Sequence, residues 1–168
     1  MRKGKKLSLK EKIAKIKIVL TDVDGVLTDG SLYYNDEGIM MKKFFVKDGM
    51  GAVLLKENGI EVGIVTSDNS ETAVARGKRL KLDLVYCAVK DKKEIMNEIC
   101  FVRNLKPENI AFIGDDVNDI GILQMAGLSA CPNDAVDQVK KIVDYVCKKE
   151  GGRGAFRELA DMIIIGGQ

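Results

Sequence analysis

The sequence of 168 residues contains no histidine and only four cysteines, none of which forms a Cys-x-x-Cys pair. Zinc sites in proteins are built mainly from cysteine and histidine ligands, so this composition argues against a zinc site. A metal bound by this chain is expected to be a hard cation held by oxygen atoms. Because the cysteines are few and show no paired spacing, we also expect a reduced, cytoplasmic protein.

Long apolar runs are missing as well. No stretch approaches the roughly 20 apolar residues of a membrane-spanning helix, so we expect no membrane partner. The N-terminus is basic, but lysines interrupt its apolar residues, which is unlike a signal peptide. There is no internal repeat and no low-complexity tract. A composition that is 46% hydrophobic and 31% charged is typical of a soluble globular domain, and this length suits a single one.

Charge is distributed unevenly along the chain. The formal net charge is +2, but residues 1–17 carry eight basic residues against Glu11 alone, which leaves the remainder at −5. We interpret residues 1–15 as a basic N-terminal extension, either a solvated arm or a ragged first helix, and residues 16–168 as one domain. A nucleic-acid-binding arm is the alternative. Because no aromatic residues are interleaved with the basic ones, we expect no nucleic-acid partner.

One segment, IKIVLTDVDGVLTDG from Ile16 to Gly30, combines a strand pattern with reactive side chains. Its apolar run is typical of a strand buried on both faces of a parallel sheet. The run ends at Asp22 and Asp24, followed at once by Gly25. Ligands of open α/β sheets lie beyond the carboxyl ends of the strands. Two acids there need a cation, a donor or a substrate, because a buried unpaired carboxylate is too costly.

Apolar strand-like runs alternate with helical patterns over the rest of the chain. This alternation predicts βαβ units, and hence an α/β fold with a doubly wound, Rossmann-like, mostly parallel sheet and helices on both faces. A small β-hairpin insert is expected after Gly30, with its turn near Gly38. Further strands are predicted at 60–65, 82–87, 110–113, 127–131 and 143–147. Helices are predicted at 50–58, 71–80, 91–104, 120–126, 134–140 and 155–165.

Polar groups follow four of the predicted strands and would lie along one edge of the sheet. They are Asp22 with Asp24, Thr66, the lysines at 90, 92 and 93, and Asp115 with Asp116 and Asp119. Each group alone can be explained as a helix cap or a solvated face. Together they form an oxygen site suited to Mg²⁺ and phosphate, with a hydroxyl and an ammonium for the phosphoryl oxygens. A carboxylate can attack phosphorus while a second acid transfers a proton.

In this order, the motifs resemble those of the haloacid dehalogenase-like phosphatases. The matching residues are DVDGV at 22–26, Thr66, Lys92 and GDDVND at 114–119. The similarity covers nearly the whole chain from Ile16. It implies that Asp22 is the nucleophile and that Asp24 is the general acid and base. It also implies that Thr66 and Lys92 bind phosphate.

The same resemblance implies a magnesium site. Its ligands would be the Asp22 carboxylate, the backbone carbonyl of Asp24 and the Asp115 carboxylate. Asp116 and Asp119 would be supporting residues around it. Mg²⁺ is therefore the expected cofactor.

The spacing of the motifs indicates which branch of this family the chain resembles. It leaves room for a hairpin and one helix between the first two motifs, but not for a cap domain. The sequences TDG at 28–30, KDG at 47–49 and GGRGAFRE at 151–158 are similar to the cap-less phosphatases that act on 3-deoxy-D-manno-octulosonate 8-phosphate and on nine-carbon 2-ulosonate 9-phosphates. This implies a homotetramer that hydrolyses a sugar acid phosphate through an aspartyl-phosphate, for lipopolysaccharide or another surface glycan.

The residues that follow Thr66, the second motif, are used to predict which sugar acid phosphate is the substrate. Octulosonate enzymes typically have Gly-Arg there and the nine-carbon relatives Gly-Glu, whereas this chain has Ser67 and Asp68. Octulosonate 8-phosphate is our leading substrate, with a KDN or N-acylneuraminate 9-phosphate as the alternative. Arg76 and Arg79 could face the sugar carboxylate, and Arg153 the substrate of the adjacent subunit. The full set of candidate substrate-binding residues is Lys47, Asp48, Ser67, Asp68, Arg76, Arg79 and Arg153.

Two interpretations of another class share part of the pattern. A phospho-accepting receiver-like signalling module is also doubly wound, with acids, a hydroxyl and a lysine. Its paired acids lie in the first loop and its phosphorylated aspartate follows a later strand, which is not the order found here. A non-catalytic interaction subunit of the same fold has no need for the intact Asp22, Asp24, Lys92 and Asp115. A phosphatase assay separates these alternatives.

Overall fold

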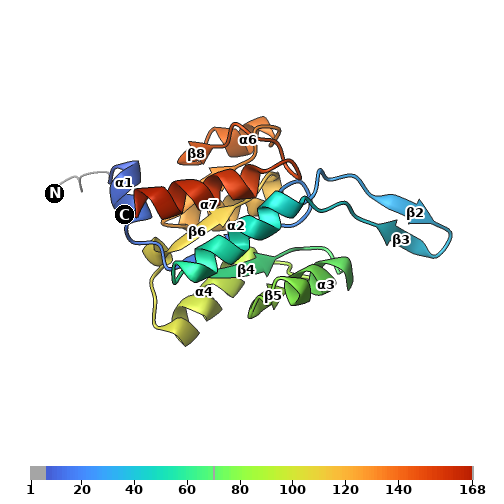
Figure 1. The fold of residues 1–168 in the computed structure, drawn as a ribbon, viewed down its shortest axis with the longest axis horizontal. Helices are drawn as coiled ribbons and strands as arrows, with labels where there is room; N and C mark the ends of the chain where they lie inside the picture. Colours follow the sequence, from blue (N-terminus) through green and yellow to red (C-terminus); the bar gives the residue numbers. More distant parts are fainter. Residues whose placement is uncertain (1–6, 70, 168) are drawn as a thin grey trace.

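The computed structural model describes residues 7–69 and 71–167. In this part of the chain, six strands form one parallel sheet in the order β5-β4-β1-β6-β7-β8 (Figure 1). The strands are β1 (Ile18–Thr21), β4 (Glu61–Val65), β5 (Leu84–Tyr86), β6 (Ile110–Ile113), β7 (Leu128–Cys131) and β8 (Tyr145–Val146). The strand order reverses between β1 and β6. In such sheets the ligand crevice lies beyond the carboxyl ends of the strands at this point.

The central strands are buried on both faces of the sheet. Along β1, Val19 belongs to one hydrophobic core, whereas Ile18 and Leu20 belong to the other. The same alternation occurs in β6, where Ala111 and Phe112 face opposite cores. Successive side chains of a strand point to opposite faces, so an unbroken apolar run fills two cores at once.

Helices cover both faces of this sheet. Helices α2 (Val46–Glu57) and α7 (Ala155–Gly166) lie side by side on one face (Figure 1). The remaining helical segments are α1 (Leu9–Ile13), α3 (Glu71–Arg79), α4 (Lys92–Arg103), η1 (Pro107–Asn109), η2 (Val117–Asp119), α5 (Ile120–Met125) and α6 (Asp137–Lys140). Helices α4, α5 and α6 contribute to the core on the opposite face. Within the described ranges, no helix is both long and apolar enough to cross a membrane.

Strands β2 (Tyr33–Asn35) and β3 (Gly38–Met41) form an antiparallel hairpin that projects from the body of the molecule (Figure 1). A bridge between Thr28 and Phe44 closes its base. Between β1 and β4, the chain forms only this hairpin and helix α2. The predicted fold class is therefore confirmed: a doubly wound parallel sheet, helices on both faces, a hairpin insert and no cap domain.

Helix α2 begins one turn earlier than the sequence predicted. The prediction started at residue 50, but the helix starts at Val46, so Asp48 lies in its first turn. The two glycines in this segment weaken the helical pattern in the sequence. In the fold, a side chain at Gly51 would press on the backbone of Arg157 at 3.2 Å. Glycine is used here because α2 and α7 approach each other closely.

Part of the predicted basic extension is a helix that packs on the domain. Ser8 caps α1 in a reciprocal capping box with Glu11. Ile13 is buried in the core beside α7, and the Lys12 ammonium lies 2.6 Å from the Asp144 carboxylate. Four of the basic residues, at positions 2, 3, 5 and 6, lie outside the described residues.

Candidate active site

A cavity at the carboxyl edge of the sheet is lined by residues from three of the four phosphatase motifs, and the motif of Lys92 is the exception. Its volume is about 350 Å³, and it opens beyond the ends of β1, β4 and β6. The lining residues are Asp22, Asp24, Gly25, Gly30, Thr66, Ser67, Asp68, Asp115, Asp116 and Asn118. Residues separated by more than 90 positions in the chain thus meet because parallel strands end at one edge.

Lys92 does not line this cavity, but its ammonium contacts Asp22, which does. It is the first residue of α4, and Asp91 caps that helix by accepting a hydrogen bond from the Lys93 amide. The Lys92 ammonium is 2.9 Å from the Asp22 carboxylate and 2.6 Å from the Asp119 carboxylate. All three side chains are buried. The ion pairs fix the orientation of Asp22 before any substrate arrives.

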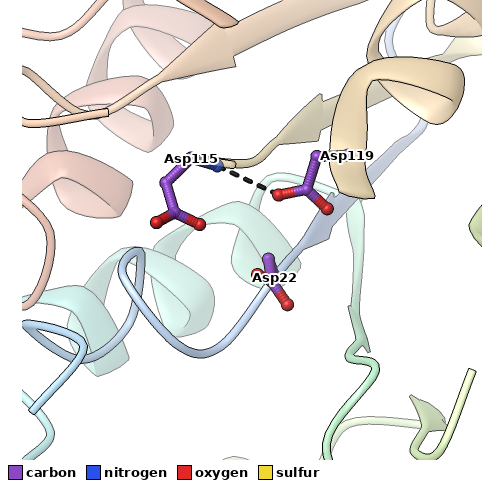
Figure 2. Close-up of side chains that lie close together, drawn as sticks. All are labelled: Asp22, Asp115 and Asp119. Atoms are coloured by element: carbon purple, nitrogen blue, oxygen red, sulfur yellow. Dashed lines mark hydrogen bonds between the residues drawn. The ribbon is translucent and has the colours of Figure 1, made fainter. Parts of the chain in front are cut away.

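Three carboxylates converge at the centre of the site (Figure 2). One oxygen each of Asp22, Asp115 and Asp119 lies within 4.8 Å of the others. Burial raises the pKa of Asp22 to about 6, and the Lys92 ammonium opposes this shift. Burial, and then repulsion by Asp22 and Asp119, raises the pKa of Asp115 to about 8. The protein alone therefore holds these acids together at an electrostatic cost.

This donor set fits a hard divalent cation. The Asp119 oxygens already have partners, since one accepts from Lys92 and the other from the Asp115 amide (Figure 2). Of these three acids, Asp22 and Asp115 line the cavity, whereas Asp119 does not. A cation between them would relieve the repulsion that raises the pKa of Asp115. Magnesium typically uses one or two carboxylates together with substrate phosphate.

The loop after β6 is built to hold these acids. Asp116 accepts a hydrogen bond from the Val117 amide at 2.6 Å and caps η2 in a reciprocal capping box with Asp119. A side chain at Gly25 would overlap the Asp115 carboxylate, and Gly25 has a φ of +85°. Glycine is required there for both reasons. The first and fourth motifs are thus packed directly against each other.

The loop after β4 forms the next wall of the cavity. Thr66 is buried, and its hydroxyl accepts a hydrogen bond from the Asp68 amide at 3.2 Å. This contact leaves the hydroxyl proton to be donated to an anion. Ser67 accepts a hydrogen bond from the Asn118 side chain at 3.3 Å, which joins the walls contributed by β4 and β6.

Sequence reasoning missed Lys42, at the end of the hairpin. Its side chain is fully buried, 2.7 Å from the Asp24 carboxylate and 2.5 Å from the Asp68 carboxylate. Burial alone would lower the pKa of Lys42, but hydrogen bonds to Asp24 and Asp68 outweigh it and raise the pKa. The charge on this ammonium is thus retained. In the sequence, nothing distinguishes Lys42 from its exposed neighbour Lys43.

The glycine-rich segment 151–154, before α7, packs against the loop that follows β1. The Gly152 amide donates to the Val26 carbonyl at 2.8 Å, and the Gly151 amide donates to Asp134 at 2.9 Å. A side chain at Gly151 would overlap the Gly25 carbonyl. Segment 151–154 therefore stabilises the loop after β1 within its own chain.

Lys47 and Arg153 do not line the catalytic cavity. They line a separate basic cavity of about 660 Å³ beside the start of α7, together with Arg157. The Arg153 guanidinium is largely exposed and lies 3.5 Å from the Glu150 carboxylate. Within one copy of the chain, neither residue joins the acids of the active site.

Asp48, Arg76 and Arg79 also lie outside the catalytic cavity. Asp48 is buried, and its carboxylate accepts from the Arg157 amide at 2.9 Å, which caps the first turn of α7. Burial raises the pKa of Asp48 to about 6. Arg76 donates to the Phe45 carbonyl and stacks over a phenylalanine ring, whereas Arg79 is exposed. The role of Asp48 in substrate binding stays a prediction, and the structure adds its contact with the start of α7.

Comparison with known proteins identifies the family. The haloacid dehalogenase-like hydrolase family matches residues 39–127. The chain belongs to this family, and the phosphatases to which it is similar, described next, show that it is a phosphoric monoester hydrolase.

Among its curated relatives is the 3-deoxy-D-manno-octulosonate 8-phosphate phosphatase KdsC of Haemophilus influenzae. The two sequences are 36% identical over 93% of this chain and 87% of the relative. The phosphatase of the same name from Yersinia pestis has a crystal structure with a TM-score of 0.92 and 33% identity, covering 95% of this chain and 86% of that one. The Moraxella catarrhalis phosphatase, solved with magnesium, phosphate and KDO, gives a TM-score of 0.90 at 32% identity, covering 94% and 90%.

Proposed function

We propose that this enzyme removes phosphate from 3-deoxy-D-manno-octulosonate 8-phosphate in a Mg²⁺-dependent reaction through an aspartyl-phosphate intermediate. The observation that carries the proposal is the position of Asp22, between the Lys92 ammonium and the Asp115 carboxylate at the floor of the cavity. A buried carboxylate held beside a cation is suited to nucleophilic attack on phosphorus. The names of the related phosphatases support the choice of substrate.

In the proposed reaction, Asp22 attacks phosphorus and Asp24 protonates the departing sugar oxygen. Asp24 then takes a proton from the water that hydrolyses the aspartyl-phosphate. Lys92 keeps Asp22 oriented, and the Thr66 hydroxyl donates to a phosphoryl oxygen. The water that enters the second step reaches Asp22 through the open cavity.

The residues proposed to hold Mg²⁺ are the carboxylates of Asp22 and Asp115, with the backbone carbonyl of Asp24. When bound, the cation supplies positive charge that reduces repulsion between the nucleophile and the phosphate. Asp116 and Asp119 support this site through the loop contacts described above. Magnesium in the Moraxella structure and cobalt in that of the Haemophilus phosphatase favour a divalent cation here.

A second candidate substrate is a nine-carbon 2-ulosonate 9-phosphate. The observation that favours it is an acid, Asp68, on the wall of the cavity where the octulosonate enzymes typically carry arginine. Asp68 is also engaged by Lys42, so the polarity of this wall differs from that of an arginine-lined pocket.

We also propose a homotetramer in the cytoplasm, in which Arg153 approaches substrate bound by a neighbouring subunit. Arg76 and Arg79 are proposed to face the sugar carboxylate. Two observations support an assembly. The hairpin exposes Tyr33 and Tyr34, and the basic cavity with Arg153 lies apart from the acids of its own subunit. Light scattering coupled to gel filtration measures the expected mass of four chains, and a monomer at assay concentration would contradict it.

The test of function is a panel of phosphate monoesters, assayed with Mg²⁺ and with EDTA. We expect the highest kcat/KM on octulosonate 8-phosphate, lower values on nonulosonate 9-phosphates and simple sugar phosphates, and loss of turnover with EDTA. Equal rates on all sugar phosphates would refute the substrate. Activity that survives EDTA would refute the role of the metal.

A further inference from the structure

The end of the projecting hairpin carries a charge into the active site. Lys42 directly follows β3, and its side chain has no exposed surface. Its ammonium joins Asp24, from the loop after β1, to Asp68, from the loop after β4. Both carboxylates line the catalytic cavity and keep about a third of their side-chain surface exposed. Three segments of the chain therefore meet in one ion-pair network around a buried ammonium.

The contacts define how Asp24 can be used. Its Oδ2 atom lies 2.7 Å from the Lys42 ammonium, whereas Oδ1 lies 3.5 Å from the Thr28 hydroxyl. A strong charge-assisted bond on one oxygen fixes the plane and direction of the carboxyl group. The other oxygen is left with the weaker contact. The geometry thus separates the oxygen that anchors Asp24 from the oxygen that can exchange a proton.

We propose that Lys42 is a positioning residue for the leaving-group half of the reaction. It directs the Asp24 carboxyl group toward the ester oxygen and ties it to Asp68 on the opposite wall. This inference rests on the proposed function, in which Asp24 is the general acid. It also gives the hairpin a role in the chemistry of its own subunit.

The proposal has a consequence that depends on the leaving group. In the first step, a bond forms between an Asp22 oxygen and phosphorus. The bond from phosphorus to the ester oxygen breaks, and that oxygen keeps the electron pair. A sugar alkoxide is strongly basic and needs the proton from Asp24 as it leaves, whereas p-nitrophenolate is a weak base and leaves without it. A misdirected Asp24 should therefore slow the sugar ester more than the aryl ester.

The experiment compares kcat/KM on octulosonate 8-phosphate and on p-nitrophenyl phosphate, since kcat/KM reports the steps up to release of the alcohol. For Lys42→Met we expect a loss of about 100-fold on the sugar ester and less than about 10-fold on the aryl ester, because general acid catalysis contributes about 10²–10⁴-fold. Asp24→Asn should show the same dependence more strongly. Lys43→Met is the matched control, because Lys43 is exposed and pairs only with Asp29 at the surface in the described contacts. It should change neither rate by more than about twofold.

The outcomes separate this inference from the proposed function. Equal losses on both esters, or no loss on either, would overturn the role of Lys42 while leaving the phosphatase intact. If the wild-type enzyme hydrolyses neither ester, the proposed function fails and the role of Lys42 fails with it. Circular dichroism checks the fold of Lys42→Met. If that variant does not fold, Lys42→Gln, which keeps hydrogen-bond donors without the charge, is measured in its place with the same expected direction.

Discussion

The two halves of the site are each organised by a buried lysine, but the lysines come from different kinds of structure. On the phosphoryl side, Lys92 begins a helix that follows strand β5. It contacts Asp22, directly after β1, and Asp119, in the η2 turn after β6. All three side chains are buried next to the central strands of the sheet.

On the leaving-group side, Lys42 comes from the base of a hairpin that projects from the domain (Figure 1). It contacts Asp24 and Asp68, which are only partly buried. Under the proposed mechanism, the groups that act on any phosphate ester follow strands of the central sheet. The lysine that positions the proposed general acid comes from an inserted hairpin instead. Two predictions test the phosphoryl side of this division.

Of the two buried lysines, Lys92 is expected to give the larger effect when it is replaced by methionine. Loss of this charge removes the ion-pair partner of Asp22 and Asp119, and we expect kcat/KM to fall by about 10²–10³-fold. In contrast to Lys42→Met, the loss should be equal for sugar and aryl esters, because Lys92 acts on the nucleophile. Steady-state kinetics on both esters measure it, with Lys93→Met, one residue further along the same helix and exposed, as the control. A loss confined to the sugar ester would break the division between the two halves.

A smaller effect concerns stability and metal binding. Without a cation, Asp115 has a folded-state pKa raised to about 8 by burial and by Asp22 and Asp119. The folded protein then keeps a proton that the unfolded chain has released, so stability should fall as the pH rises from about 4 to about 8. At the proposed site, Mg²⁺ would compete with this proton, and we expect it to bind better at higher pH. Thermal unfolding should show a larger increase in Tm from Mg²⁺ at pH 8 than at pH 6. An increase that is unchanged or smaller at pH 8 would contradict this origin of the shift.

The sequence was sufficient to predict the sheet and the strand-end acids. Each of these features is local: a short apolar run followed within two residues by a carboxylate or hydroxyl, as at Ile110–Ile113 before Gly114 and Asp115. The order of the motifs along the chain then determines which groups meet at the edge of the sheet. The arrangement of Asp22 and Thr66 around one cavity follows from this rule.

The sequence was insufficient where a residue acts through a distant partner. Asp48 stands in a motif that resembles a substrate-binding sequence, and the sequence does not show that its carboxylate also accepts a hydrogen bond from the Arg157 amide at the start of α7. Lys42 was overlooked because its partners are 18 and 26 residues away, and the hairpin alone does not show which way its side chain turns. Both residues depend on tertiary packing, which local patterns do not encode.

The most direct test of the account is to identify the phosphorylated residue. Enzyme mixed with labelled substrate and quenched in acid within one turnover should carry phosphate on the peptide that contains Asp22. Asp22→Asn, which keeps the shape of the side chain, should show no label and no turnover, and its circular dichroism should match that of the wild type. Label on any other residue, or turnover by Asp22→Asn at the wild-type rate, would contradict the central role of Asp22.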